Sequence, residues 1–201
     1  MRLAAQLSIA NDMPNILFEN QLERLQFCLR LLNGDAFQRN LDAAVNLLAL
    51  TLTGNRPVLV CGNGGSAADS QHIAGELVGK FLKDRRALNV RSLAVDASVI
   101  TAWANDVAYD TIFSRQVEAY AQSGGVLFAI STSGNSQNVV LAAEKAKEMG
   151  MKVIALTGEG GGSLAQFADI LLSAPSKSTP RIQEMHMMIY HYLCEQVEVQ
   201  F

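Results

Sequence analysis

The chain has 201 residues, of which 49% are hydrophobic and 17% are charged, and its formal net charge is −3. This length and composition predict one globular domain, or at most two small ones, with a full hydrophobic core, and they exclude a disordered or low-complexity protein. The mildly acidic balance argues against nucleic acid as a partner, and no apolar run has the ~18–20 residues that a membrane span needs.

The cysteines and the first residues predict a cytoplasmic protein. Cys28, Cys61 and Cys194 are odd in number, widely spaced and without a CxxC motif, which indicates reduced thiols. The apolar stretch in residues 1–10 is weak and ends at Asn11, so we expect no signal peptide.

Residues 1–55 have a helical pattern. From Pro14 to Leu32, apolar residues recur at spacings of three and four, and Asn33-Gly34 is a fitting stop. A second helix is predicted from about Ala36 to Thr53, with Asp35 as its N-cap. These helices are too short to form a core of their own, so we expect them to pack on the following domain or on another subunit.

From residue 56 onward, short apolar runs alternate with helical segments. Five runs predict β-strands, at 58–61, 92–95, 126–130, 153–156 and 170–174. Strands without polar alternation are buried on both faces, as in a parallel sheet covered by helices. We therefore predict an α/β fold, a doubly wound five-stranded parallel sheet, in a single domain over residues 1–201. Ligands of such a fold bind at the carboxyl ends of the strands.

Two loops at predicted strand ends are rich in glycine and hydroxyl groups, Gly-Asn-Gly-Gly-Ser at 62–66 and Ser-Thr-Ser-Gly-Asn-Ser at 131–136. Glycines let the backbone approach a ligand and leave N–H groups free at a helix start, where they bind phosphate. One such loop fits a tight turn equally well, but two in one sheet favour an anion site. There is no lysine cluster, Walker A or GxGxxG motif, so a small sugar phosphate fits better than a nucleoside triphosphate.

Histidine and carboxylate residues form a second group. His72 and Glu76 are four residues apart and share one helical face, either as a solvated ion pair or as a metal or acid–base site. In the last helix, about 181–197, Gln183 and Glu184 lie about 80° and 20° from His191 around the axis. His186 points about 140° away from His191, so we expect it to be structural.

Other chemistries have weaker support. No GxSxG motif of a serine hydrolase is present. Cys61 fits a buried strand residue better than a nucleophile, and Trp103 fits a core residue. The methionines of the last helix indicate helix packing, within or between subunits; they are Met185, Met187 and Met188.

Together these motifs resemble the SIS (sugar isomerase) domain and, within it, the phosphoheptose isomerases, over almost the whole chain. The residues that carry the resemblance are Cys-Gly-Asn-Gly-Gly-Ser at 61–66, Gln71-His72 with Glu76-Leu77, Ala104-Asn105-Asp106, Phe113 to Val117, Ile130 to Ser136 and Arg181 to His186.

The resemblance implies a sheet in flavodoxin-like order, a homotetramer built on the helices and active sites near subunit interfaces. The implied reaction interconverts sedoheptulose 7-phosphate and D-glycero-D-manno-heptose 7-phosphate, the entry to bacterial heptose synthesis for lipopolysaccharide. Such an isomerase moves a proton between C1 and C2 through an enediolate, so no nucleotide cofactor is expected.

The resemblance also implies roles for residues. Glu76 would be the base and His191 the acid. A Zn²⁺ ion would be held by His72, Glu76, Gln183 and His191. The substrate would contact Asn63, Gly64, Gly65, Ser66, Glu76, Asn105, Asp106, Ser131, Thr132, Ser133, Ser136 and Gln183. Of these, Ser131, Thr132, Ser133 and Ser136 would hold the phosphate.

The alternative is a non-catalytic replication regulator of the same fold that binds the initiator DnaA. That group resembles this chain in its loops but lacks the carboxylate at the position of Glu76 and the imidazole at that of His191, so the enzyme is favoured. Sugar-phosphate-sensing regulators are more distant, because they usually carry a DNA-binding module. Lys80 and Gly125 depart from residues common in the isomerases, Arg and Asp respectively.

Overall fold

The computed structural model describes residues 17–201. The expected helix start at Pro14 and the expectation of no signal peptide in residues 1–10 lie outside the described residues. Within the described part of the chain, no helix is both long and apolar enough to cross a membrane. All three cysteines are buried free thiols.

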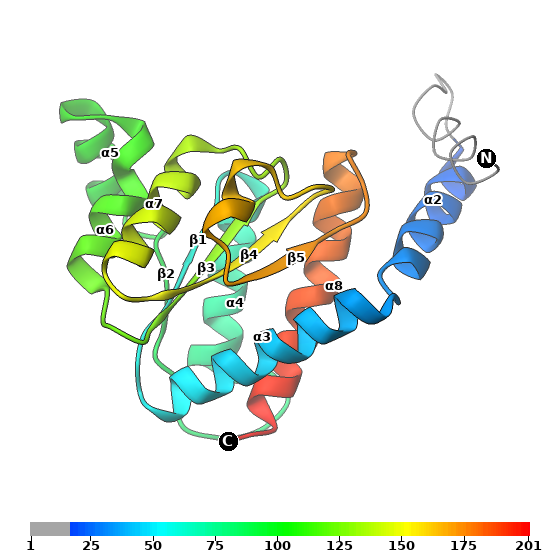
Figure 1. Cartoon of the computed structure of the whole chain (residues 1–201), viewed down its shortest axis with the longest axis horizontal. Helices are drawn as coiled ribbons and strands as arrows, with labels where there is room; N and C mark the ends of the chain where they lie inside the picture. Colours follow the sequence, from blue (N-terminus) through cyan, green and yellow to red (C-terminus); the bar gives the residue numbers. More distant parts are fainter. Residues whose placement is uncertain (1–16) are drawn as a thin grey trace.

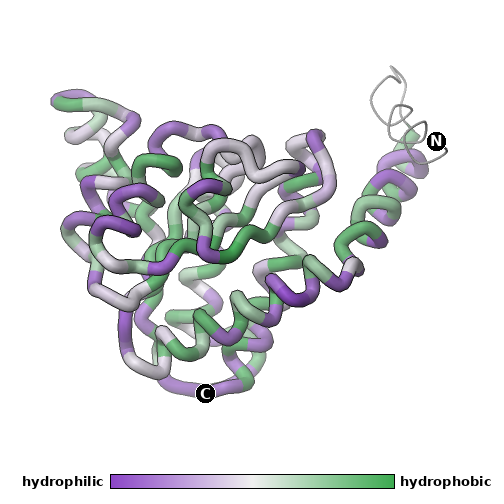
Figure 2. Tube along the Cα trace, in the orientation of Figure 1, coloured by the Kyte–Doolittle hydropathy of each residue, from purple (hydrophilic) through white to green (hydrophobic). Residues whose placement is uncertain are grey.

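In residues 17–57, two helices precede the sheet, as predicted. Helix α2 spans Phe18–Leu31 and helix α3 spans Asp35–Thr53. Asp35 is the first residue of α3 rather than its N-cap, which is Gly34, because the Asp35 backbone already has helical geometry. Figure 2 shows hydrophobic and hydrophilic residues alternating along both helices, as expected for helices with one buried face.

The sheet has five parallel strands in the order β2-β1-β3-β4-β5, which confirms the predicted doubly wound fold. The strands are β1 (Val58–Cys61), β2 (Val90–Ser92), β3 (Val126–Ser131), β4 (Lys152–Thr157) and β5 (Ile170–Ser173). Four of them lie where the apolar runs placed them.

The second strand was predicted too late in the chain. It pairs Val90 with Val58 and Ser92 with Val60, whereas the prediction began at Ser92 and ended at Val95. The chain turns away after Leu93, and Val95 is 60% exposed. The exposed Arg91 interrupts the apolar run in the real strand and so hid it.

Helices cover both faces of the sheet (Figure 1). After the strands come α4 (Gly65–Val78), α5 (Ala97–Asp106), α6 (Ile112–Tyr120), α7 (Gln137–Glu148) and α8 (Thr179–Glu198), with 3₁₀ turns at Tyr109–Thr111 and Gly162–Phe167. Alternate residues of one strand serve two cores: Val58 and Val60 face the side of α3, α4 and α8, whereas Leu59 and Cys61 face the side of α6 and α7.

Two features of this fold position the candidate site. Strand β2 lies on one side of β1, and β3 and the later strands lie on the other. The loops that follow the neighbouring strands β1 and β3 therefore lie at the switch point where such folds bind ligands. Helices α4 and α8 lie side by side and run in the same direction, since Gln183 contacts Gly65 at one end and Glu198 contacts Phe81 at the other.

Candidate functional site

One histidine–carboxylate cluster lies between α4 and α8. His72 and Glu76 are one turn apart on α4, with 3.0 Å between Nε2 and Oε1. From α8, the ring of His191 meets the ring of His72 edge-on, with 5.0 Å between centroids. One ligand atom from each of the three residues lies within 4.8 Å of the others. The structure thus brings together the predicted base, the predicted acid and one more predicted metal ligand.

The cluster is partly shielded from solvent. The side chain of Glu76 is 21% exposed and that of His72 is 41% exposed. Burial and the neighbouring His72 lower the pKa of His191, although the Glu76 carboxylate opposes them. The Phe81 ring stacks on His191 with 5.8 Å between centroids.

The donor set of the cluster fits a metal ion. Two imidazoles and one carboxylate on facing helices are a ligand set that Zn²⁺ takes in catalytic sites, where a fourth position stays open. The ligand atoms are close enough to share one ion after small side-chain rotations. His72, Glu76 and His191 are therefore the residues of this chain that would hold a metal.

Gln183, the fourth predicted ligand, lies elsewhere in the same chain. Its side chain covers the backbone at the start of α4, where a Cβ added to Gly65 would stand 2.2 Å from the Gln183 Nε2. Gln183 precedes His191 by eight residues, which is about 12 Å along the helix axis. Within one chain, the structure does not bring Gln183 to the cluster.

The first glycine loop is a compact turn into α4. Gly64 has φ +55°, and a Cβ on Gly62 would stand 2.7 Å from the Ser66 backbone oxygen, so both positions favour glycine. The Asn63 side chain exchanges two 2.8 Å hydrogen bonds with the Asn138 amide, and it accepts a third from the Tyr109 hydroxyl at 2.9 Å. These bonds fix the loop against α7.

The second loop, residues 131–136, packs closely against the backbone at Gly161. Gly134 has φ +67°, and a Cβ there would stand 2.0 Å from the carbonyl oxygen of Gly161. The Ser131 and Ser136 hydroxyls are 3.0 Å apart, and Ser133 is exposed. The loop therefore presents hydroxyls at the start of α7, an arrangement suited to an anion.

Asn105 and Asp106 lie apart from both groups. They are exposed at the end of α5, where the Asn105 amide donates to the Asp106 carboxylate at 2.8 Å. The contact with the first loop comes instead from Tyr109, in the 3₁₀ turn that follows α5, which donates to Asn63.

The structure adds three residues that the sequence did not single out. The Tyr190 hydroxyl lies 3.0 Å from Nδ1 of His72 and 3.4 Å from Asp69 Oδ1, and Phe81 covers His191. Asp69 precedes His72 by three residues, a helical spacing that could have indicated it. Tyr190 and Phe81 carried no comparable signal.

His186 has the structural role that was expected of it. It is fully buried, and its Nε2 lies 3.0 Å from the carbonyl oxygen of Thr157, at the end of β4. A carbonyl only accepts hydrogen bonds, so Nε2 carries the proton. Burial lowers the pKa of His186 to about 4.

Known proteins are similar to this chain in sequence and fold. The SIS domain family model matches residues 33–158. A phosphoheptose isomerase of Helicobacter pylori (strain P12) is 48% identical over 167 residues, covering 83% of this chain and 87% of the relative.

Two solved structures of phosphoheptose isomerases also align with this chain. Phosphoheptose isomerase GmhA from Neisseria gonorrhoeae aligns with a TM-score of 0.80 and 37% identity, over 98% of this chain and 97% of that chain. A phosphoheptose isomerase from Francisella tularensis aligns with a TM-score of 0.85 and 34% identity, over 90% and 96%. The chain belongs to the phosphoheptose isomerases of the SIS domain family.

Proposed function

We propose that this protein interconverts sedoheptulose 7-phosphate and D-glycero-D-manno-heptose 7-phosphate through an enediolate. The observation that carries the proposal is the meeting of Glu76 with His191 between α4 and α8, in a chain whose relatives are named phosphoheptose isomerases. A carboxylate beside an imidazole supplies the base and the acid that the proton transfers need. The DnaA-binding alternative has no use for this pair.

In the proposed mechanism, Glu76 removes the proton from the carbon next to the carbonyl and returns it to the neighbouring carbon. His191 donates and accepts protons at the two oxygens. The hydroxyls of the second loop, Ser131 to Ser136, hold the phosphate. A Zn²⁺ ion bound by His72, Glu76 and His191 would polarise the substrate carbonyl.

We further propose that the site is completed between subunits. Glu76 follows Gly65 by eleven residues, which places it about 16 Å along α4 from the first loop. That separation is longer than an extended seven-carbon sugar phosphate, so the loops and the cluster of one chain do not share one substrate. Gln183 and the pair Asn105 and Asp106 are likewise separate from the cluster within one chain.

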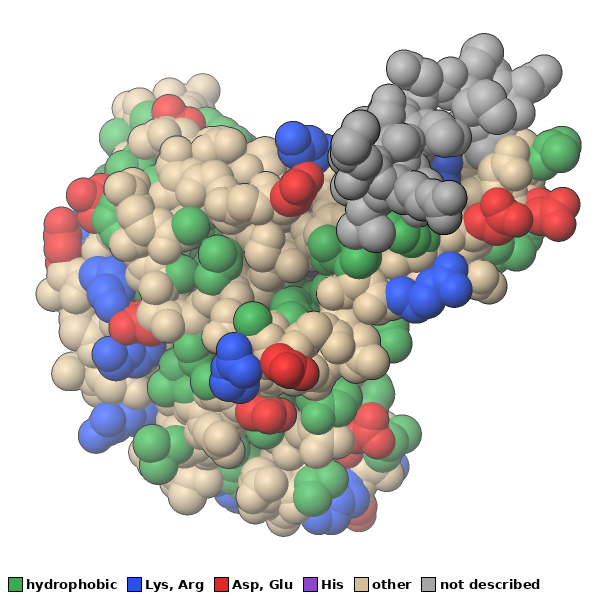
Figure 3. All heavy atoms as spheres, turned by 45° about the vertical axis from the view of Figure 1, so that its right-hand side comes forward, with side chains coloured by type: hydrophobic (Ala, Val, Ile, Leu, Met, Phe, Trp, Pro, Cys, Tyr) green, Lys and Arg blue, Asp and Glu red, His purple; other side chains and the backbone are tan. Residues whose placement is uncertain are grey.

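Exposed apolar side chains support self-association, and we propose that the assembly is a homotetramer. On the arm formed by α2, Phe18 is 76% and Leu22 is 44% exposed, and on α8 Met187 and Met188 are 45% and 57% exposed. Figure 3 shows hydrophobic side chains at the surface of this arm. Side chains of this kind on adjoining helices are typical of subunit interfaces. The proposed setting is the cytoplasm, at the start of heptose synthesis for lipopolysaccharide.

The test is solvent-deuterium exchange followed by NMR. Wild-type protein supplied with Zn²⁺ and sedoheptulose 7-phosphate should incorporate deuterium next to the carbonyl while the aldose accumulates. Glu76→Gln, which keeps the shape and removes the base, should show neither. Absence of exchange in folded, zinc-supplied wild-type protein would contradict the proposal, and DnaA binding would then be assayed.

A further inference from the structure

We infer that Asp69 and Tyr190 are positioning residues that hold His72 with its proton on Nδ1, leaving Nε2 free to bind a cation. This inference rests on the proposed metal site for the identity of the cation. Its first observation is a chain of polar contacts from Asp69 through Tyr190 to His72 and Glu76.

The direction of these hydrogen bonds follows from their buried end, at Asp69. Asp69 is 8% exposed, and its Oδ2 has no hydrogen-bond partner among the described residues. An ionised carboxylate only accepts hydrogen bonds. If the Tyr190 hydroxyl donated its hydrogen bond to His72, neither oxygen of the Asp69 carboxylate would have a donor. A buried charge without a partner is strongly unfavourable.

The hydroxyl of Tyr190 therefore donates to Asp69 Oδ1, and its oxygen is left to accept. The only neighbour that can donate to it in this chain of contacts is Nδ1 of His72, at 3.0 Å. A neutral imidazole carries one proton, so with Nδ1 protonated, Nε2 has a lone pair.

Nε2 faces a carboxylate. It lies 3.0 Å from Glu76 Oε1, so a cation bound by both atoms would take the place of a proton shared between them. His191 completes the same cluster from α8. The contacts behind His72 thus prepare its outward nitrogen as a ligand, the arrangement in which a metal-binding histidine donates its other N–H to an outer partner.

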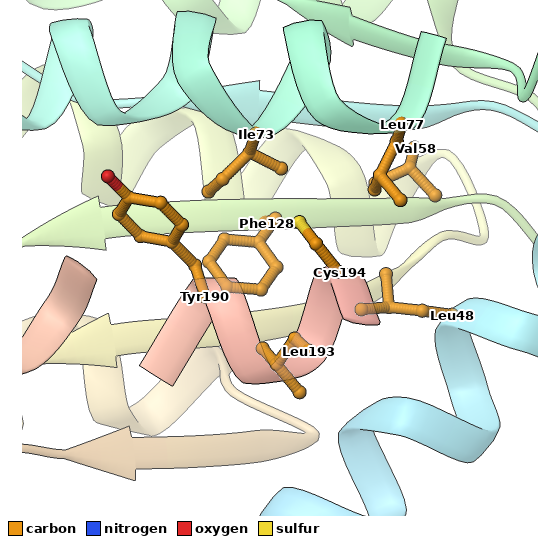
Figure 4. Close-up of a pocket in the computed structure, with 8 residues that line it drawn as sticks. All are labelled: Leu48, Val58, Ile73, Leu77, Phe128, Tyr190, Leu193 and Cys194. Carbon is orange, nitrogen blue, oxygen red and sulfur yellow. The ribbon is translucent and has the colours of Figure 1, made fainter. Parts of the chain in front are cut away.

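Tyr190 is held firmly enough for this role. It is fully buried, and Figure 4 shows its ring among apolar side chains such as Ile73 and Phe128, with the hydroxyl directed away from them. A Phe at this position would keep the ring packing and lose only the oxygen.

The experiment reads the tautomer directly. The chain has three histidines, so protein with ¹⁵N-labelled histidine gives a spectrum that His72→Asn and His191→Asn can assign. His186, with its proton on Nε2, is the internal reference. In metal-free wild-type protein at pH 8, His72 should carry a proton on Nδ1. In Tyr190→Phe, that preference should be lost.

The second readout is Zn²⁺ affinity, measured by competition with a chelator. Tyr190→Phe should weaken Zn²⁺ binding by about 10–100-fold, whereas Tyr192→Phe, the same change on the more exposed side of α8, should leave it unchanged. A wild-type His72 whose Nδ1 carries no proton overturns the inference, as does unchanged affinity in a folded Tyr190→Phe. The wild-type spectrum decides the matter even if the variant fails to fold. Neither readout uses isomerase activity, so failure of the proposed function is detected separately.

Discussion

Glu198 and Arg85 form an ion pair, with 3.2 Å between Oε1 and Nη2, and their side chains are only 2% and 1% exposed. Glu198 ends α8, and its carboxylate also accepts hydrogen bonds from the backbone N–H groups of residues 81–83, at 2.6–2.9 Å. Arg85 donates in turn to the carbonyl oxygens of Gly79 and Glu76. This pair therefore fixes the segment that follows α4 and places Phe81 over the cluster.

Glu198→Gln should destabilise the protein strongly. The substitution keeps the shape but leaves the Arg85 charge buried without its partner, and breaking one side of a buried pair typically costs about 3–5 kcal/mol. Chemical denaturation at fixed protein concentration measures the change in the free energy of unfolding. Glu195→Gln, on an exposed position of the same helix, is the control and should change it by less than about 0.5 kcal/mol. Equal stability of the two variants would show that the pair is not the anchor of this segment.

The fold was largely predictable because its signals are local. Buried parallel strands appear as apolar runs bounded by turn residues, and only the strand interrupted by Arg91 was misplaced. The parallel order and the loops at the switch point follow from the alternation of strands and helices.

The site was predictable only in part, because it depends on which helices face each other. The angle between Gln183 and His191 describes their direction around α8 but omits the 12 Å or so between them along its axis. The role of Tyr190 required the relative placement of α4 and α8, which no spacing in the sequence contains. Asp69 lies at helical spacing from His72, but its inferred role, which is to accept a hydrogen bond from Tyr190, can be recognised only once Tyr190 is placed between them.

His186 should make the protein less stable as the pH falls from about 6.5 to about 4. Its pKa is lowered from 6.5 to about 4 by burial, so in this window the unfolded chain binds a proton that the folded chain does not. The stability contribution is complete above the unfolded pKa and is lost toward the folded one, by about 3 kcal/mol. His186→Gln, whose amide can still donate to Thr157, should remove this part of the pH dependence. The measurement is the unfolding free energy of the wild type and of His186→Gln as a function of pH. Identical slopes for the two proteins between pH 4 and 6.5 would contradict the role of His186 in this pH dependence.

Gly125 should not tolerate a side chain. A Cβ there would stand 2.8 Å from the Pro57 carbonyl oxygen and 3.0 Å from that of Gln122. Gly125→Ala should therefore destabilise the protein by about 1–3 kcal/mol. Gly75→Ala is the matched control: nothing lies within 4 Å of its Cβ, and in a helix interior Ala should stabilise by about 0.5–1 kcal/mol. Thermal unfolding of both should give shifts of opposite sign.

Subunit mixing can decide whether the phosphate loops and the Glu76 cluster of one active site come from different chains. Glu76→Gln removes the base, and Ser133→Asp places a negative charge where the phosphate would bind, so each variant alone should be inactive. When the two variants are unfolded together and refolded as mixed oligomers, some sites combine an intact loop from one chain with an intact Glu76 from the other. If sites are shared between chains, random 1:1 mixing restores about one quarter of them. If each chain supplies both parts of its own site, no mixture regains activity.

The control for that experiment is Ser123→Asp mixed with Glu76→Gln. Ser123 is exposed before β3, at the opposite end of the strand from Ser133, so Ser123→Asp should be active alone. Its mixture should show about the half activity expected from simple dilution of intact Glu76 sites. Recovery in the Ser133→Asp mixture therefore has to be compared with that half-active reference. A recovery near one quarter requires that Glu76 act on a substrate whose phosphate is held by another chain, which the 16 Å or so along α4 between Gly65 and Glu76 already favours.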